Sequence, residues 1–340
     1  MKVFLFLLVL VFVIFDGYSI DKITHDNLKR IKNIKEFQDI MTNKTSIVLE
    51  GVDDNFFNHF SRLKISDEYI VATSQMVNVY VWDYRGTLIG KIGKSGKGPG
   101  EFKVAGDVIF IGVDKIAVHD AFRGILSVFK KNSGTFVYDN DIDLFSALNI
   151  EQFPPMVISK YKDGFVGLEG AFLKNKYRFY IMDNNFKPIV TGWKLKDDTH
   201  DYGMVFDSFG VNDKYIYMTD LWKRKNDANK KLLYYYRDNS VVYLYDFSGK
   251  LIKKIKTFSK NEIKVFPDRS GKVLNILDME SSIVQCINID TKKEITRLKF
   301  PFEVKRTTKN IIFFPGKIVH LFIDENKKVM IDMYDVDFGL

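Results

Sequence analysis

"VNVYVWDYRGTLIGKIG", residues 77–93, holds two short runs of β-branched and aromatic residues on either side of a polar turn at Tyr84-Arg85-Gly86. Val, Ile, Tyr and Trp favour extended backbone, and a glycine after polar residues is typical of a hairpin turn. The stretch therefore predicts a β-hairpin, and the recurrence of this hairpin decides the fold.

The hairpin pattern returns along the rest of the chain. Further turns are predicted at Asn132-Ser133-Gly134, Asn184-Asn185-Phe186, Phe247-Ser248-Gly249 and Asp290-Thr291-Lys292, and a last copy begins at residue 328. Another pair of strands precedes each hairpin, as in "YIVAT" (69–73) and "KIAVHD" (115–120). The turns are about 43 to 63 residues apart, close to the length of a propeller blade. We therefore expect an all-β chain that forms a six-bladed β-propeller with four antiparallel strands in each blade.

The last repeat lacks an outer strand, because the sequence ends at Leu340. The early run "TSIVLEG", residues 45–51, is a candidate for this strand, and its addition closes the ring by joining the two ends of the chain. The alternative is a ring of seven blades in which residues 45–60 open an extra blade.

Composition fits a large β domain. The 340 residues are 46% hydrophobic and include 30 Phe and 17 Tyr, enough apolar material for one large core. The net charge of +8 is spread along the chain without a long basic block, which argues against a nucleic-acid partner. The single cysteine, Cys286, has no partner for an internal disulfide and is expected to be a buried structural thiol.

The N-terminus has the features of a secretory signal peptide, predicted at residues 1–19: a lysine, an apolar run at 3–15 and small residues beyond it. Residues 20–44 are predicted to form a lead-in segment with a short amphipathic helix, and residues 45–340 the propeller. No later run approaches the ~20 residues that span a bilayer. We therefore expect an exported protein, periplasmic or secreted, with no transmembrane span after signal cleavage.

The glycine-rich stretch "KIGKSGKGPGEF", residues 91–102, invites comparison with phosphate-binding loops. It fails the P-loop pattern, because Pro99 stands where lysine is required, and it fails the dinucleotide-binding pattern as well. The residues after it predict strand rather than helix, so the helix N-terminus that holds a phosphate is missing. We expect a turn between blades, with Pro99-Gly100 in a type II turn, Glu101 accepting backbone N–H groups and Phe102 anchored between blades. Lys94 and Lys97 are weaker candidates for contact with an anionic ligand at the rim.

Two passages carry a family resemblance. "GKSGKGPGEF" (93–102), followed by "DVIFIGVDKIAVHDAF" (107–122), resembles the glycine-rich signature of exported six-bladed propellers that are common in Bacteroidetes. "KYIYMTDLWKRK" (214–225) with "VVYLYDFSGKLIKKI" (241–255) is similar to the tyrosine-rich strands, variable insertion and hairpin of the same family. These proteins are known as 6-bladed or TolB-like propellers and are distant relatives of NHL repeats. The resemblance implies the fold and export, and it supplies no catalytic residues.

Metal-binding residues are the first candidates for chemistry. His119-Asp120 and His320 occupy equivalent strand pairs of two repeats, from which side chains can reach a central channel. Together with ligands from other blades they would suit Ca²⁺ or Zn²⁺. The simpler interpretation is that they are ordinary polar strand residues and that the protein has no cofactor.

Three acidic clusters are also present, at Asp53-Asp54-Asn55, at residues 139–143 and at residues 197–201. None has the spacing of a calcium-binding loop, and solvated turns are the favoured interpretation. The sequence has no nucleophile elbow, and no residue is assigned as catalytic.

An aromatic and basic insertion separates two strands of the fourth repeat. It contains Trp222, the charged run at 223–231 and Tyr234, Tyr235 and Tyr236. Side chains alternate along a strand, so the three tyrosines cannot all face a core, and some aromatic surface is expected. These residues are candidates for ligand binding. The alternative is an oversized hairpin that packs on the blade.

The function expected from these features is that of an exported, non-catalytic binding or interaction module of the cell envelope. A propeller presents a broad face of loops that suits a protein, peptide or glycan ligand. The alternative is a metal-dependent lactonase, lyase or hydrolase with its site at the mouth of the channel. A purely architectural component of an envelope complex is a third possibility.

Overall fold

The computed structural model describes residues 35–36, 41–74, 77–120, 122–150, 154–155, 157–169, 178–194, 209–211, 215–218, 221–227, 232–238, 241–248, 250–257, 263–268, 272–279, 281–300, 311–314 and 316–336. All of them belong to one compact unit, residues 35–340. The predicted signal peptide and most of the predicted lead-in segment lie outside the described residues, and both stay predictions.

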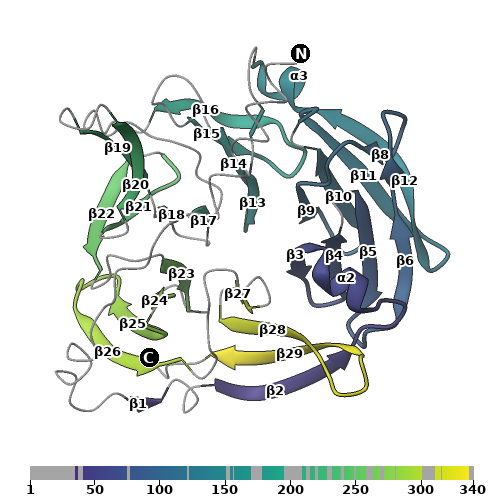
Figure 1. The fold of residues 1–340 in the computed structure, drawn as a ribbon. Helices are drawn as coiled ribbons and strands as arrows, with labels where there is room; N and C mark the ends of the chain where they lie inside the picture. The colour runs from purple at the N-terminus through teal and green to yellow at the C-terminus, as the bar shows by residue number, and fades with distance from the viewer. Residues whose placement is uncertain are drawn as a thin grey trace. The chain divides into compact units, whose positions relative to one another are not determined.

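Six four-stranded antiparallel ladders form the body of this unit. Blade 1 comprises β3 (Phe60–Ile65), β4 (Tyr69–Ser74), β5 (Asn78–Asp83) and β6 (Leu88–Ile92). Blade 2 comprises β9 (Asp107–Phe110), β10 (Lys115–Asp120), β11 (Ile125–Asn132) and β12 (Thr135–Asp143). Blade 3 comprises β13 (Val157–Tyr161), β14 (Gly164–Glu169), β15 (Arg178–Met182) and β16 (Pro188–Lys194). Blade 4 comprises β17 (Phe209–Val211), β18 (Ile216–Met218), β21 (Val241–Tyr245) and β22 (Leu251–Lys256). Blade 5 comprises β23 (Ile263–Pro267), β24 (Val273–Asp278), β25 (Ile283–Asn288) and β26 (Glu294–Lys299). Blade 6 comprises β27 (Ile311–Phe314), β28 (Lys317–Ile323), β29 (Val329–Val336) and β2 (Met41–Val48). Figure 1 shows the first strand of each blade nearest the centre of the ring.

The blades are held together by apolar side chains that fill each space between neighbours. Six buried clusters lie between consecutive blades, and the one formed by blades 6 and 1 completes the circle. Strand β4 shows why this works: Ile70 and Ala72 pack against blade 6, whereas Tyr69 and Val71 pack against blade 2. Successive side chains of a strand point to opposite faces of its blade. A strand whose blade is covered by a neighbour on each side must therefore carry apolar side chains on both faces. Strand β4 is accordingly buried at every position.

The ring closes as the sequence predicted. Strand β2 pairs antiparallel with β29 and supplies the outer strand of blade 6, with Ile47 opposite Ile331. Polar contacts reinforce the pairing: the Ser46 hydroxyl donates to Asp332 Oδ1 at 2.6 Å, and Lys44 Nζ lies 2.8 Å from Asp332 Oδ2. The fold is therefore a six-bladed β-propeller, and the seven-blade alternative is wrong.

The N-terminal boundary differs from the expectation. Strand β2 begins at Met41, four residues before the predicted start of the propeller at residue 45. A two-residue strand, β1 (Lys35–Glu36), pairs in parallel with β26 of blade 5.

Several elements lie at one end of the ring, where the chain passes from each blade to the next. We call this end the connection face and define it by residues 49–59, 93–106 and 144–150. It carries two short helices, α2 (Asp54–Asn58) and α3 (Leu144–Leu148), and the parallel pair of β7 (Lys94–Ser95) and β8 (Glu101–Phe102). Figure 1 shows α2 beside β3 and β4 of blade 1.

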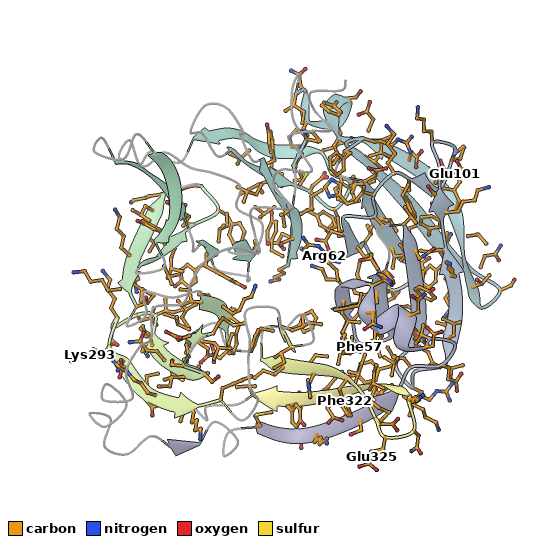
Figure 2. All side chains as sticks on the ribbon, in the orientation of Figure 1. Phe57, Arg62, Glu101, Lys293, Phe322 and Glu325 are labelled. Atoms are coloured by element: carbon orange, nitrogen blue, oxygen red, sulfur yellow. The ribbon has the colours of Figure 1, made fainter. Side chains whose placement is uncertain are left out.

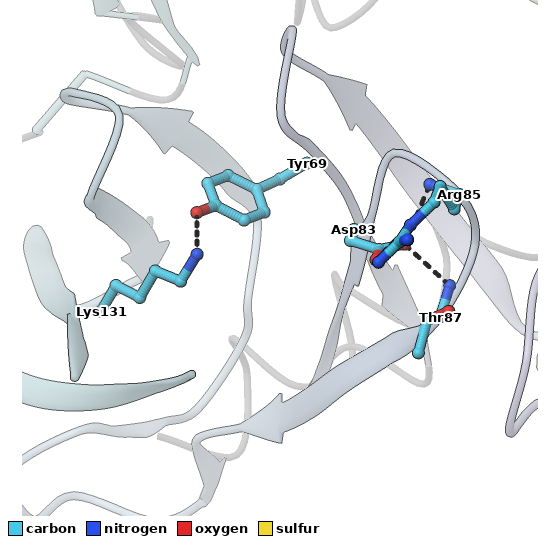
Figure 3. Close-up of polar contacts among 5 residues, drawn as sticks. All are labelled: Tyr69, Asp83, Arg85, Thr87 and Lys131. Carbon is cyan, nitrogen blue, oxygen red and sulfur yellow. Dashed lines mark hydrogen bonds and ion pairs between the residues drawn. The ribbon is translucent and has the colours of Figure 1, made fainter. Parts of the chain in front are cut away.

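The predicted hairpin turns are confirmed, and an aspartate fixes several of them. In blade 1, Asp83 Oδ1 accepts from the backbone N–H groups of Arg85 at 2.9 Å and Thr87 at 3.0 Å (Figure 3). Asp183 and Asp246 make the same pair of bonds in blades 3 and 4. These side chains satisfy backbone donors that the strand ladder leaves free at the turn.

A second contact in Figure 3 joins neighbouring blades. Lys131 Nζ of blade 2 donates to the Tyr69 hydroxyl of blade 1 at 2.7 Å and lies 5.0 Å from the centre of its ring. Cys286 lies in the cluster between blades 5 and 6, fully buried, and burial raises the pKa of its thiol. The prediction of a buried structural cysteine is confirmed.

Substitution of Ile47 tests ring closure. Ile47 is 5% exposed in the cluster between blades 6 and 1, whereas Val48 on the same strand is 38% exposed. We expect Ile47→Ala to lower the free energy of unfolding by about 2–4 kcal/mol, and Val48→Ala by about 0.5 kcal/mol or less. Urea unfolding measures both. Equal losses would contradict the role of β2 as a packed blade strand.

The aspartate turns predict a loss of stability in acid. Burial works to raise the pKa of Asp83, but hydrogen bonds from Thr87 and Arg85 outweigh it and hold that pKa below its usual value. This contribution is complete above the unfolded pKa of about 4 and disappears as the pH falls through the lower folded pKa. Asp83→Asn keeps an acceptor, as Asn288 does in blade 5, so unfolding free energies measured between neutral and acid pH should show a shallower fall. An unchanged slope would contradict this assignment.

Candidate functional site

The glycine-rich loop of the connection face is a built turn. The Glu101 N–H donates to the Gly98 carbonyl at 3.0 Å, and Gly100 has a φ of +68°. This is the type II turn predicted at Pro99-Gly100, in which only glycine takes the positive φ without strain. The loop joins β6 of blade 1 to β9 of blade 2, as expected.

Glu101 organises this loop through its carboxylate. Gly98 N–H donates to Oε2 at 2.8 Å, and Lys94 Nζ lies 3.1 Å from Oε1. These two contacts, the hydrogen bond from Gly98 first, hold the pKa of Glu101 below its usual value. Lys94 is therefore paired with Glu101 while remaining largely exposed. The Lys97 carbonyl accepts from Arg123 Nη2 at 3.1 Å, which ties the loop to blade 2.

Phe102 anchors the loop between blades, as predicted. Its side chain is fully buried in the cluster of blades 1 and 2 and meets the ring of Phe129 edge-on at 6.0 Å. Gly93 is required beside it, because a Cβ there would lie 1.9 Å from the Phe102 ring. The glycines and Glu101 therefore set the shape of this loop and its packing between the blades. Lys94 and Lys97 remain candidate ligand contacts at its surface.

His119 and Asp120 end strand β10 at the connection face. Asp120 is almost fully buried and accepts from the backbone N–H groups of Lys103 at 2.7 Å and Arg123 at 3.3 Å. His119 is fully buried opposite Asp107 of β9, and so does not line an open channel. Burial lowers the pKa of His119 to about 4, against the opposing effects of Asp107 and Asp120. The imidazole is therefore neutral at neutral pH.

His320 lies in β28 of blade 6, opposite Asp332, and its ring stacks on Phe322 at 5.1 Å. Blade 1 separates it from His119 of blade 2, so the structure does not bring the two histidines together. Within the described ranges, no group of three or more His, Cys, Asp or Glu side chains is placed to hold a metal ion. The metal site proposed from the sequence stays a prediction.

Two acidic clusters cap helices. Asp53 accepts from the backbone N–H groups of Asn55 and Phe56 at the start of α2, and Asp143 accepts from those of Phe145 and Ser146 at the start of α3. A side-chain acceptor before the first turn satisfies donors that a helix leaves unpaired. The third cluster, residues 197–201, lies outside the described residues.

The insertion of blade 4 forms a hairpin of its own. Strands β19 (Leu221–Asp227) and β20 (Leu232–Asp238) pair antiparallel and, among the described strands, bond to no other. The register sets basic residues opposite aromatic ones: Lys223 with Tyr236, Arg224 with Tyr235, Lys225 with Tyr234, and Trp222 with Arg237. We call residues 221–238 the ribbon. It leaves blade 4 between β18 and β21, at the connection face.

A pocket of about 450 Å³, not foreseen from the sequence, opens at the same face. It is lined by Gly51, Val52, Asp53, Asn55, Phe56, Ser74 and Tyr80. The residues come from the connection between β2 and β3 and from the facing ends of β4 and β5. Figure 2 shows Phe57 of α2 and Arg62 of β3 on the side of blade 1 that faces the centre of the ring. No single motif contains the pocket, because three separate segments form it.

Comparison with known proteins supports the fold. A family model described as 6-bladed beta-propeller matches residues 18–296. The chain is similar to the crystal structure of a Bacteroides fragilis protein that is thought to be exported, with 12% identity, a TM-score of 0.53, and 88% of this chain and 96% of that one covered.

Two further similar structures have lower scores. One is Hsv2 from Kluyveromyces lactis, with 11% identity, a TM-score of 0.43, and coverage of 80% of this chain and 84% of that one. The other is the computationally designed protein Ika8, with 14% identity, a TM-score of 0.45, and coverage of 82% and 84%. No curated protein matches the chain in sequence. In the described part of the chain, no helix has the length and apolar character needed to cross a membrane.

The loop geometry predicts coupling between Gly96 and Glu101. A Cβ on Gly96 would lie 1.9 Å from Glu101 Oε2, whereas a Cβ on Gly112 meets nothing closer than 3.8 Å. Gly96→Ala should destabilise the protein by about 1–2 kcal/mol, and Gly112→Ala should have a much smaller effect. In a Glu101→Ala background the cost of Gly96→Ala should fall by at least half, as measured by a double-mutant cycle of unfolding free energies. Full additivity would show that the carboxylate does not set the requirement for glycine.

Proposed function

Because the chain belongs to the 6-bladed beta-propeller family, we propose that it is an exported, non-catalytic binding module of the cell envelope, which contacts a protein, peptide or glycan at its connection face. The family match identifies the fold and leaves the activity open. Export is supported by the signal-like N-terminal sequence and by the similar Bacteroides fragilis protein that is thought to be exported.

The ribbon is the observation that carries the proposal. Every blade already has four strands, and the ribbon adds hydrogen bonds to none of the described ones. An element that the scaffold does not need, placed on a rigid ring, is where recognition residues gather in many proteins. Its composition fits this role, because Trp, Tyr and Arg are enriched at the centres of binding surfaces. The residues we propose for ligand contact are Trp222, Tyr234, Tyr235 and Tyr236. Lys94 and Lys97, in the glycine-rich loop of the same face, are proposed as further ligand contacts.

The ribbon predicts a loss of binding when it is removed. The full chain is compared with a variant in which a Gly-Ser linker replaces residues 221–238, on an array of peptides and oligosaccharides of defined composition. Ile189→Ala is the matched control, because Ile189 is 60% exposed on β16, outside the ribbon. We expect wild type and control to bind the same probe and the ribbon variant to bind it at least about tenfold more weakly. Equal binding by all three proteins would contradict the proposal.

A metal-dependent hydrolase is the second candidate, and one observation favours it. In the described structure, both ring nitrogens of His119 and Oδ2 of Asp107 are buried without a hydrogen-bond partner. A neutral imidazole beside a carboxylate is the form that binds Zn²⁺. Lys64 Nζ weighs against it, because it lies 3.6 Å from Asp107 Oδ1 and competes with a cation.

Metal analysis separates the two candidates. Under the binding-module proposal, purified protein holds no stoichiometric Zn²⁺ or Ca²⁺, and His119→Leu keeps or raises the free energy of unfolding, because it removes unpaired buried polar atoms. A stoichiometric metal that is lost in His119→Leu, measured by mass spectrometry, would favour the hydrolase.

A further inference from the structure

We propose that the pocket lined by Gly51, Val52, Asp53, Asn55, Phe56, Ser74 and Tyr80 binds one neutral sugar unit. This inference rests on the proposed binding function and names a ligand class and a second contact point on the same face. The pocket is distinct from the ribbon, because it lies against blade 1, whereas the ribbon leaves blade 4.

The volume and the walls of the pocket suit a small ligand. About 450 Å³ lies within the range of small-molecule sites. One wall is the connection that carries the chain from the closing strand β2 to blade 1, and it includes Gly51, Val52 and Asn55. The opposite wall is blade 1 itself, through Ser74 at the end of β4 and Tyr80 in β5.

The lining favours hydroxyl groups over charged groups. Asn55 offers an amide that both donates and accepts, and Ser74 offers a hydroxyl that does the same. The one carboxylate, that of Asp53, already accepts at Oδ1 from the backbone N–H groups of Asn55 at 3.0 Å and Phe56 at 3.2 Å. None of the described lining residues carries a positive charge to pair with an anion. A ring that carries several hydroxyls matches these donors and acceptors. Tyr80 contributes its hydroxyl, because its ring stacks on Trp82 at 5.7 Å and has Lys91 Nζ over it at 5.4 Å.

Packing holds the walls in place before a ligand arrives. The Phe56 ring meets Tyr80 edge-on at 5.3 Å and Trp82 edge-on at 5.7 Å. Trp82 Nε1 donates to the Glu50 carbonyl at 2.8 Å, which ties blade 1 to the same connection. A preformed site costs little conformational entropy on binding.

The position of the pocket links binding to ring closure. A ligand that touches both Asn55 and Tyr80 bridges the connection and blade 1, and it binds only when the two are assembled. Such a ligand stabilises the folded protein by mass action. Thermal unfolding is therefore a readout of binding that requires no knowledge of any activity.

The test uses the full chain with glucose, galactose, mannose and N-acetylglucosamine as separate probes. Saturation-transfer NMR detects binding, and the shift of the unfolding temperature with sugar concentration measures it. Asn55→Ala and Tyr80→Phe remove one polar group each, and Asn140→Ala removes an exposed asparagine outside the pocket. We expect at least one sugar to bind wild type and Asn140→Ala equally, and to bind Asn55→Ala about tenfold more weakly. Tyr80→Phe keeps the aromatic ring and serves as the second variant if Asn55→Ala does not fold.

Two results would overturn the inference: none of the four sugars binds folded wild type, or both pocket variants bind as wild type does. Its failure is separable from failure of the binding function. If no sugar binds the pocket but an array probe still needs the ribbon, the pocket assignment is wrong and the binding module stands. If a sugar needs Asn55 while no probe needs the ribbon, the pocket assignment stands and the ribbon proposal is wrong.

Discussion

The pairing of β2 with β29 is the constraint on which the rest of the ring depends. A blade has two apolar faces, and both are buried only when the blade has a neighbour on each side. Ile47 and Ile331 of blade 6 share one buried cluster with Ile70 and Trp82 of blade 1, so the outer strand of the last blade also supports the first. Closing the chain in this way joins residues that are almost 300 positions apart in sequence, with Ser46 bonded to Asp332. Long-range closure of this kind is costly in chain entropy and is offset by the packing of the whole ring.

Turn chemistry and strand pattern were sufficient to predict the architecture. Gly86 and the polar residues before it marked the first hairpin, and the run at residues 45–51 was named as the outer strand of the last blade, where β2 now lies. The same reasoning explained the glycine-rich loop, because Pro99-Gly100 and Glu101 each have a local role that sequence specifies. The turn aspartates were missed, since Asp83 stands one residue before the predicted turn and acts through its side chain.

Features that arise from several segments were not predictable. The pocket joins Asn55, Ser74 and Tyr80, and nothing in a linear pattern shows that these residues meet. Helices α2 and α3 have five residues each, too short for an apolar period to appear. His119 was a candidate for a channel position, although an ordinary polar strand residue was the simpler interpretation, and it is fully buried. Strand β10 is the second strand of its blade and is covered on both faces. In each case the neighbours in space, rather than those in sequence, decide the environment.

These constraints separate the residues that hold the fold together from the elements that are candidates for binding. The apolar residues and the turn residues form the six ladders and the six buried clusters. The glycine-rich loop, the pocket and the ribbon lie at the connection face. The recognition that we propose at this face requires a ring that stays closed. Hydrogen–deuterium exchange on the full chain tests that requirement most directly. We predict that two amide groups that face β29, those of Ile47 in β2 and of Leu49, whose N–H donates to the Val329 carbonyl, are protected as strongly as those of Val71 and Ala72 in β4. Both strands open only when the ring unfolds. Rapid exchange in β2 beside slow exchange in β4 would show that the ends of the chain are not joined, and would contradict the closed ring.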